Sequence, residues 1–248
     1  MRHLFVEPGG LSGDELRIGG LDHHHLANVL RIRPGEVVQL QDGEGARLAA
    51  VCRVEARATV LALGDVVAPP GRPGLKITIA QAIGKGTRFE EALEHSTEAG
   101  AAAFIPLVTS RTVVRIAAAD VPVRLERWGR ILKGAAEQAG RDRIPTIVAP
   151  IDWAAFVRIP CEPLIAAPGS VTSLADAVRV RTSRKSAELT VVIGPEGGLA
   201  EEEIALAEAV GGARVGLGEF VYRTETAGVA AIAIALTVAG NHQACAAR

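Results

Sequence analysis

The sharpest candidate for a chemical site is a glycine-rich segment at residues 194–198, with the sequence Gly-Pro-Glu-Gly-Gly. It follows the apolar run 191–193 and precedes three consecutive glutamates at 201–203. Glycine lets the backbone approach a ligand closely and adopt positive φ, and open α/β sheets bind ligands beyond the carboxyl ends of their strands. The pattern predicts either a ligand-binding loop or an ordinary turn from a strand into a helix.

A second group of candidates stands just ahead of the apolar run at 227–240. A glycine turn at 216–218 leads to the sequence Arg-Thr-Glu-Thr at 223–226. One interpretation is the start of a helix, with a threonine as its cap and Glu225 near its positive end. The other is a ligand loop in which Arg223 and Glu225 take part. The apolar run has no polar face, which predicts burial against a sheet on one side and a second subunit on the other.

A third feature is the excess of basic residues between positions 111 and 143, where eight bases stand against four acids. The helical spacing of this segment buries one apolar stripe and places Arg130, Lys133, Glu137 and Arg141 on another face. The whole chain has a net charge of −1, so a polyanion such as RNA can be held only by a local patch of this kind. The alternative is a solvated helix face.

Several common kinds of site are excluded by the motifs. The sequence contains no P-loop, dinucleotide fingerprint, helical zinc-protease motif or nucleophile elbow. The three histidines at 23–25 point in different directions on a helix and have no further ligand at suitable spacing, so we expect no metal site. Cys52, Cys161 and Cys245 form no Cys-x-x-Cys pair, which favours a cytoplasmic location. No apolar run is long enough to cross a bilayer, so we expect no membrane partner.

The elements that must position these residues fall into two parts, divided at 66–74, where three prolines and two glycines disfavour both helix and central strand. Before this boundary, the runs 36–42 and 46–54 flank a glycine turn and predict a hairpin, and 58–63 predicts a further strand. This part is typical of a small β-rich barrel. One helix, capped by Asp22, interrupts it and turns a single face inward, made of His25, Leu26, Val29 and Leu30.

Beyond the boundary, apolar runs typical of strands alternate with helical stretches. The predicted strands are 76–81, 102–107, 146–149, 163–167, 189–193 and 215–217. The predicted helices are 89–99, 123–139, 174–180, 201–210 and 224–239. Alternation of this kind predicts an α/β domain with a mostly parallel sheet and helices on both faces.

Five motifs, in order along nearly the whole chain, match a known family. They are His-His-His-Leu-Ala-Asn-Val-Leu-Arg at 23–31, Lys-Gly at 85–86, Glu-Gln-Ala-Gly-Arg at 137–141, Ile-Gly-Pro-Glu-Gly-Gly at 193–198 and Arg-Thr-Glu-Thr at 223–226. In these motifs the sequence resembles the ribosomal RNA small subunit methyltransferase E family of the SPOUT superfamily. One departure is Glu219-Phe220, which stands where the family usually has proline and arginine.

The resemblance implies a PUA-like β-barrel RNA-binding domain over residues 1–68 and a trefoil-knotted α/β domain over 74–248. The second domain is expected to bind S-adenosylmethionine and to form a homodimer. The implied reaction is methylation of uracil N3 in 16S rRNA of the small ribosomal subunit, without a metal ion. The alternative function is that of a non-catalytic RNA-binding or ribosome-assembly protein on the same scaffold.

The resemblance also implies site residues. Those expected to hold the cofactor are Ile165, Ala166, Gly194, Pro195, Glu196, Gly197, Gly198, Leu217, Gly218, Arg223, Thr224, Thr226 and Ala227. Those expected near RNA are His25, Arg31, Lys85, Arg88, Arg130, Lys133, Glu137, Gln138, Arg141 and Arg143. Because uracil N3 carries a proton, transfer needs a base or a cation that stabilises the deprotonated ring. Arg223, then Arg141, are the candidate cations, and Glu225 either accepts the proton or orients Arg223.

Overall fold

The described chain divides into two units, each with its own sheet. The computed structural model describes residues 1–68, 74–183 and 188–240, so Cys245 lies outside the described residues. Unit 1 comprises Met1–Gly71 and Ala136–Ile144, and unit 2 comprises Arg72–Ala135 and Pro145–Arg248. The main division falls within the boundary region 66–74, whereas nothing in the sequence pattern assigned 136–144 to unit 1.

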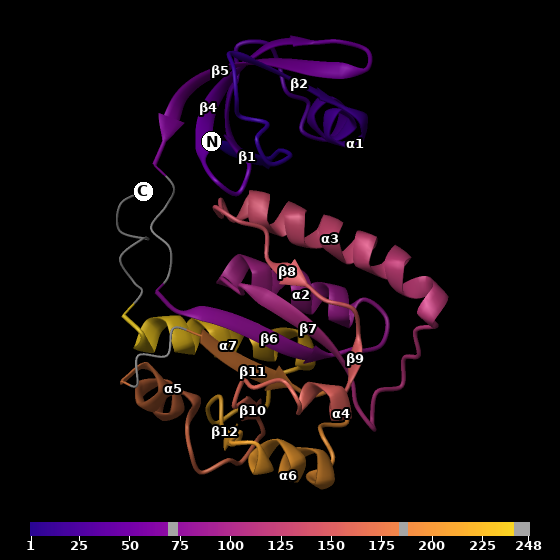
Figure 1. Ribbon diagram of the computed structural model, residues 1–248, viewed down its shortest axis with the longest axis vertical. Coiled ribbons are helices and arrows are strands. Elements are labelled where there is room, and N and C mark those ends of the chain that lie inside the picture. The colour runs from indigo at the N-terminus through magenta and orange to yellow at the C-terminus, as the bar shows by residue number, and fades with distance from the viewer. Residues whose placement is uncertain (69–73, 184–187, 241–248) are drawn as a thin grey trace. The chain divides into compact units, whose positions relative to one another are not determined.

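Unit 1 is built around a five-stranded mixed sheet with the order β1-β3-β4-β5-β2. Its strands are β1 (Arg2–Phe5), β2 (Glu15–Gly19), β3 (Val37–Gln41), β4 (Ala46–Val54) and β5 (Ala58–Val67). β1 pairs parallel with β3, and the other pairs are antiparallel, including the predicted hairpin β3–β4. No pairing joins β1 to β2 in the described chain, so the expected barrel is an open, curled half-barrel (Figure 1).

The helical segment after β2 begins earlier than predicted. α1 (Gly20–His24) continues directly into a π-helical turn, η1 (His25–Val29). Gly19 occupies the N-cap position of α1, and no side chain of the described residues caps the helix. The prediction of Asp22 as the cap was therefore wrong, because the chain is already helical two residues before it.

The inward face of this segment also differs from the prediction. His23 and Leu26 are buried, whereas His25 and Val29 are exposed. His23 takes an inward position because its Nδ1 shares a hydrogen bond of 3.0 Å with the buried Thr59 Oγ1. A π-helical turn spaces its residues differently from an α-helix, so the face expected from α-helical spacing was wrong.

Unit 2 contains a parallel sheet with the order β12-β10-β11-β6-β7-β8, and β9 also pairs with β7. The strands are β6 (Lys76–Ala82), β7 (Ala103–Val108), β8 (Thr146–Ile147), β9 (Ile151–Asp152), β10 (Leu164–Ala166), β11 (Glu188–Ile193) and β12 (Ala213–Val215). The six predicted strands are confirmed with ends shifted by one or two residues, and β9 was missed. The trefoil knot that the resemblance implies stays a prediction.

Helices cover both faces of this sheet (Figure 1). They are α2 (Arg88–Ala99), α3 (Val121–Gln138), α4 (Trp153–Phe156), α5 (Leu174–Ser183), α6 (Glu201–Ala209) and α7 (Thr224–Val238), with a 3-10 turn, η2 (Ala118–Asp120), before α3. α4 and α6 pack on the face that carries Ala80, whereas α7 approaches the neighbouring Ile79. Successive residues of a strand point to opposite faces, so these helices lie on opposite sides of the sheet. The five predicted helices are confirmed, and α4 was missed.

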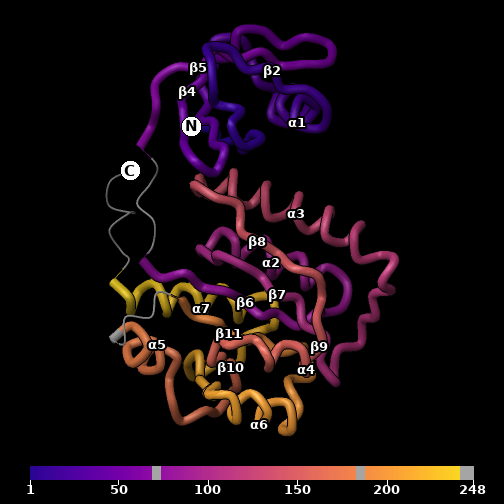
Figure 2. Tube along the Cα trace, in the orientation of Figure 1, coloured from indigo at the N-terminus to yellow at the C-terminus, as the bar shows by residue number. Residues whose placement is uncertain are grey.

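α7 is the apolar helix of the prediction, and unit 2 buries most of it. It contacts α2, α5, β6 and β11, and Figure 2 shows its path beside these elements. Its closest approach is at Gly228, where a Cβ atom would lie only 2.7 Å from Ser96 Oγ of α2. Ala233 and Thr237 remain exposed. The expected burial on every side is therefore incomplete within one chain.

Replacing Gly228 with alanine is expected to lower the free energy of unfolding by about 1–3 kcal/mol, because the added methyl group overpacks the contact between α2 and α7. Alanine is otherwise the better helix former by roughly 1 kcal/mol, so helix propensity alone predicts the opposite sign. Urea unfolding of the purified protein measures the difference.

The double variant Gly228→Ala/Ser96→Ala separates crowding from other causes. Ser96 Oγ is buried and has no hydrogen-bond partner, so its removal makes room and loses no hydrogen bond. The double variant should recover most of the lost stability. Equal destabilisation of the single and double variants would contradict the steric explanation.

Candidate functional site

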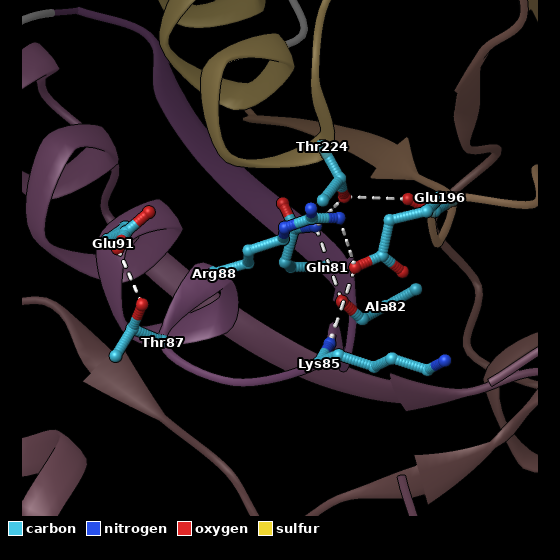
Figure 3. A network of polar contacts seen from close by, with 9 residues as sticks. Gln81, Ala82, Lys85, Thr87, Arg88, Glu91, Glu196 and Thr224 are labelled. Carbon is cyan, nitrogen blue, oxygen red and sulfur yellow. Dashed lines mark hydrogen bonds and ion pairs between the residues drawn. The ribbon is translucent and has the colours of Figure 1, made fainter. Parts of the chain in front are cut away.

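The candidate site lies where the two central strands of unit 2 end. β6 and β11 are parallel neighbours, with Gln81 opposite Ile193, so the segments that follow them lie side by side. One of these segments is 83–87, and the other, 194–198, is called the glycine loop below. The first residue of α7 meets both strand ends at the same place (Figure 3). Ligands of open α/β sheets bind beyond such adjacent carboxyl ends.

A single hydroxyl group joins these three elements. Gln81, which is buried, donates from Nε2 to Thr224 Oγ1 over 2.9 Å. The Thr224 hydroxyl in turn donates to the carbonyl oxygen of Gly194 over 2.8 Å. Thr224 therefore ties the start of α7 to the end of β6 and to the first residue of the glycine loop. The amide oxygen of Gln81, Oε1, is buried and has no hydrogen-bond partner in the part of the chain that the structure describes.

The carboxylate of Glu196 joins the glycine loop to the segment after β6. Its Oε1 accepts hydrogen bonds from Arg88 Nη1 at 2.8 Å and from the backbone N–H of Lys85 at 3.3 Å (Figure 3). Partial burial raises the pKa of Glu196, but hydrogen bonds from its own backbone N–H, from Arg88 and from Lys85 outweigh burial and hold the pKa below its usual value. Glu196 is therefore an ionised link between the two segments at neutral pH.

A second cation holds the other side of the glycine loop. Arg111 Nη1 donates to the carbonyl oxygen of Gly197 over 2.7 Å. The turn itself closes with a hydrogen bond of 2.8 Å from the Gly198 N–H to the Pro195 carbonyl, and Gly198 has φ +71°. A Cβ atom at Gly194 would lie 3.2 Å from Leu199, so packing and turn geometry account for the glycines at 194 and 198.

Gly197 has no such explanation within the chain. Its φ is outside the left-handed region, and among the described residues a Cβ atom there would meet only Arg111, at ordinary contact distances of 3.6 and 3.8 Å. The residue is exposed. A glycine without an internal reason, on an exposed turn at a strand end, is what close approach of a ligand to the backbone would require.

The buried carboxylate of Glu203 stabilises the segment that follows the glycine loop. Glu203 accepts from the backbone N–H groups of Ser110 at 2.7 Å and Ala200 at 2.9 Å. The carbonyl oxygen of Glu203 accepts from Trp153 Nε1 at 2.9 Å. These bonds fix the start of α6 against the loop that carries Arg111.

The remaining predicted cofactor loop follows β12. A parallel bridge pairs Gly216 with Ser173, Leu217 is half-buried, and Gly218 is exposed with φ +136°. Ile165 lies in β10 between two paired strands with its side chain fully buried, and Ala166 is half-buried at the end of that strand.

The first turn of α7 contains the predicted catalytic residues of unit 2. Arg223 occupies the N-cap position, is exposed, and accepts the N–H groups of Thr226 and Ala227 at its carbonyl oxygen. Glu225 is half-buried, and its Oε2 is buried and has no hydrogen-bond partner among the described residues. No ion pair joins Glu225 to Arg223 in the part of the chain that the structure describes. The expectation that Glu225 orients Arg223 therefore has no supporting contact.

The predicted RNA residues are spread over both units. In unit 2, Arg130 of α3 is exposed and lies 3.7 Å from Glu126, and Lys133 is half-buried. Lys85 and Arg88 contact the glycine loop, as described above. In unit 1, His25, Arg31, Gln138 and Arg143 are exposed.

Two predicted residues of unit 1 are partly structural. Glu137 Oε1 accepts the backbone N–H of Phe5 at 2.9 Å and so fixes β1. Burial lowers the pKa of the half-buried Arg141, against the opposing effect of the Asp142 carboxylate. The guanidinium is nevertheless charged at any physiological pH.

Three residues of the site were not assigned to it from the sequence. Gln81 is the only amide in the apolar strand β6, and a lone polar residue at the end of such a run is a signal that it has a buried partner. Arg111 was counted with the basic segment, and Glu203 was counted with the acidic helix start. Their roles depend on contacts with residues 86 and 93 positions away, which no local pattern contains.

Residues 1–68, 74–183 and 188–240 contain no cluster of three or more His, Cys, Asp or Glu side chains arranged to hold a metal ion. None of the described helices is both long and apolar enough to cross a membrane.

Comparison with known proteins gives consistent results. Residues 72–236 match the RNA methyltransferase domain family. The chain is 38% identical over 225 residues to the ribosomal RNA small subunit methyltransferase E of Mycobacterium bovis, covering 87% of this chain and 83% of the relative. It is 36% identical over 213 residues to the protein of that name in Synechocystis, covering 85% of this chain and 69% of the relative.

A solved structure matches both units. The crystal structure of a ribosomal RNA small subunit methyltransferase E from Neisseria gonorrhoeae, bound to S-adenosylmethionine, superposes with a TM-score of 0.84 at 30% identity. The match covers 96% of this chain and 97% of that one.

Replacing Thr224 with valine is expected to lower the free energy of unfolding by about 1–3 kcal/mol, because it removes the hydroxyl partner of the Gly194 carbonyl and leaves Gln81 Nε2 with only its longer bond of 3.3 Å to the Ala82 carbonyl. Thr224→Ser keeps the hydroxyl and should lose much less. Urea unfolding of the two variants makes the comparison, and equal losses would show that the hydroxyl bridge contributes nothing beyond packing.

Proposed function

Because this chain belongs to the ribosomal RNA small subunit methyltransferase E family, we propose that it transfers a methyl group from S-adenosylmethionine to N3 of a uridine in 16S rRNA. The observation that carries the proposal is the meeting of the glycine loop, the segment after β6 and the start of α7 at adjacent strand ends. Thr224 and Glu196 hold these three segments together. The trefoil knot is the threading we expect for this part of the chain.

The residues present fit S-adenosylmethionine. Gly197 leaves open backbone on an exposed turn, and Glu225 Oε2 is a buried acceptor without a partner. An ammonium group or a ribose hydroxyl of the cofactor would supply the missing donor to such an acceptor. We propose that the cofactor is held by the loop residues expected from the sequence, namely Gly194, Pro195, Glu196, Gly197, Gly198, Leu217, Gly218, Arg223, Thr224, Thr226 and Ala227, with Ile165 and Ala166 lining the adjacent strand end.

The bound cofactor supplies an electrophilic methyl group on its sulfonium. The protein's own contribution is to hold the uracil in line with that group, since alignment of two reactants removes much of the entropic barrier. We propose that Arg223 stabilises the negative charge of the deprotonated ring, and that Glu225 accepts the N3 proton on the carboxylate oxygen that does not pair with the cofactor. Arg141, in unit 1, is the second candidate for the cation.

The RNA-binding surface is proposed to include both units. Residues 1–68 of unit 1 are proposed to act as the PUA-like RNA-binding domain. His25 and Arg31 are exposed on this part, and Gln138 and Arg143 are exposed on the 136–144 segment of the same unit. Arg130 and Lys133 of α3 are the proposed phosphate contacts in unit 2. A non-catalytic RNA-binding protein on this scaffold has no specific observation in its favour. With a substrate of this kind, we propose a cytoplasmic location.

The first prediction from the proposed function concerns the cofactor. Gly197→Val should abolish S-adenosylmethionine binding in calorimetry, because a branched side chain fills the approach to the loop. The fold should survive, since the φ of Gly197 is allowed for valine and the nearest side chain is the flexible Arg111. Gly45→Val, at an open hairpin position of unit 1, is the matched control. Unchanged cofactor binding by a folded Gly197→Val protein would make the glycine loop purely structural.

The second prediction concerns RNA. Arg130→Ala, Lys133→Ala and Arg141→Ala should each reduce the salt dependence of RNA binding by about one phosphate contact and leave cofactor binding unchanged. Arg179→Ala, which removes an exposed basic side chain from α5, should change neither the salt dependence of RNA binding nor the binding of the cofactor. Incubation of the wild-type protein with small subunits and the cofactor should yield 3-methyluridine in digested rRNA. Absence of this product, with cofactor binding intact, would favour the non-catalytic alternative.

The third prediction is that the protein is a homodimer through α7. The exposed residues Ala233 and Thr237 lie on an apolar helix that unit 2 covers only in part. Light scattering at micromolar concentration should report about twice the 25.8 kDa chain mass. A fully active monomer would remove this proposal.

A further inference from the structure

The aromatic residues of this chain are distributed unevenly between core and surface. The sequence has eight of them, and six are buried: Phe5, Phe89, Phe104, Trp128, Trp153 and Phe156. The remaining two are Phe220, which is 80% exposed, and Tyr222, which is 39% exposed. Val221 between them is 76% exposed. All the aromatic surface that the chain presents to solvent is thus concentrated in one segment, 220–222.

This segment directly adjoins the proposed cofactor site. It follows the bend at Gly218, whose φ of +136° turns the chain away from β12. It ends at Arg223 and Thr224, and the hydroxyl of Thr224 is bonded to the glycine loop. The C-terminal end of segment 220–222 is therefore fixed at the site, while its aromatic side chains remain outside the core. A contiguous exposed apolar patch of this kind commonly marks a binding surface.

The charges around the segment favour contact with the face of an RNA base over contact with a phosphate group. Glu219 and Arg223, both exposed, flank the aromatic residues and cancel in charge. A neutral segment with an exposed ring offers no attraction to the RNA backbone, but it offers a π surface on which a base can stack.

We infer that Phe220, assisted by Tyr222, stacks on an unpaired base of the RNA substrate at the methylation site. This inference rests on the proposed function. N3 lies on the edge that uracil uses for base pairing, so the target must be unpaired before it can be methylated, and an enzyme that unpairs a base usually replaces its lost stacking with aromatic contacts. Phe220 is thus a substrate-recognition residue.

Steady-state kinetics with small ribosomal subunits test the inference. Phe220→Leu keeps an apolar side chain and removes the ring, and it should lower kcat/KM for the subunit by about tenfold without changing the affinity for S-adenosylmethionine. Phe220→Trp keeps a π face and should stay within about twofold of the wild type. Val221→Ala, which removes a neighbouring exposed side chain without a ring, is the matched control and should also stay close to the wild type. Equal kcat/KM values for Phe220→Leu and the wild type would overturn the inference.

A binding measurement separates this inference from the proposed function. A fluorescent oligouridine and the same sugar-phosphate chain without bases are compared by anisotropy. The wild type and Phe220→Trp should prefer the chain with bases, and Phe220→Leu should lose the preference. This result would support stacking even if the wild type produced no 3-methyluridine, whereas a wild type without preference would overturn it. If Phe220→Leu instead halves the mass measured by light scattering, the segment is an interface between two copies, and the inference is equally overturned.

Discussion

The architecture of the site depends on the donor group of one buried amide. Gln81 is buried at the end of an apolar strand, and its Nε2 donates to the Ala82 carbonyl at 3.3 Å and, over a shorter distance of 2.9 Å, to Thr224; a buried hydrogen bond of this kind is worth about 0.5–1.5 kcal/mol. The Thr224 hydroxyl accepts from that amide and passes a hydrogen bond on to Gly194. A hydroxyl group can accept and donate a hydrogen bond at once. The Thr224 hydroxyl therefore fixes the start of α7 beside Gln81 and fixes Gly194, where the glycine loop leaves β11, beside the same hydroxyl. The close approach of Gly228 to α2 follows from the same placement of α7.

The charged groups at the exposed edge of the glycine loop have a different role. The Arg88–Glu196 pair and the bond from Arg111 to the Gly197 carbonyl are both largely exposed. Exposed ion pairs contribute little to stability, typically about 0–1 kcal/mol. Their value here is geometric, because each fixes one flank of a loop whose glycines would otherwise leave it free to move. The buried Glu203 does the same for the base of the loop with backbone N–H groups as its partners.

The sequence revealed the periodic elements well and the tertiary contacts poorly. Apolar runs such as 76–81 and 189–193 identified the central strands, because burial on both faces of a parallel sheet leaves an uninterrupted apolar pattern. The two-residue β9 and the one-turn α4 are too short to carry a period. Helical spacing failed at His25 because the chain makes a π-helical turn there. The glycine loop was found from its composition, whereas Gln81, Arg111 and Glu203 were not, because their partners lie far along the chain.

The contact between Gln81 and Thr224 spans 143 positions of sequence, and the pair formed by Arg88 and Glu196 spans 108. Closing such long loops costs chain entropy that local segments do not have to overcome, so these contacts cannot form early in folding. During synthesis, β6 leaves the ribosome long before the residue that completes its hydrogen bond has been added to the chain. A nascent chain can therefore build unit 1 and several strands of unit 2 while the candidate site does not yet exist. An enzyme assembled in this order gains its chemistry only near the end of translation, so a prematurely terminated copy would be inert toward the ribosomes around it.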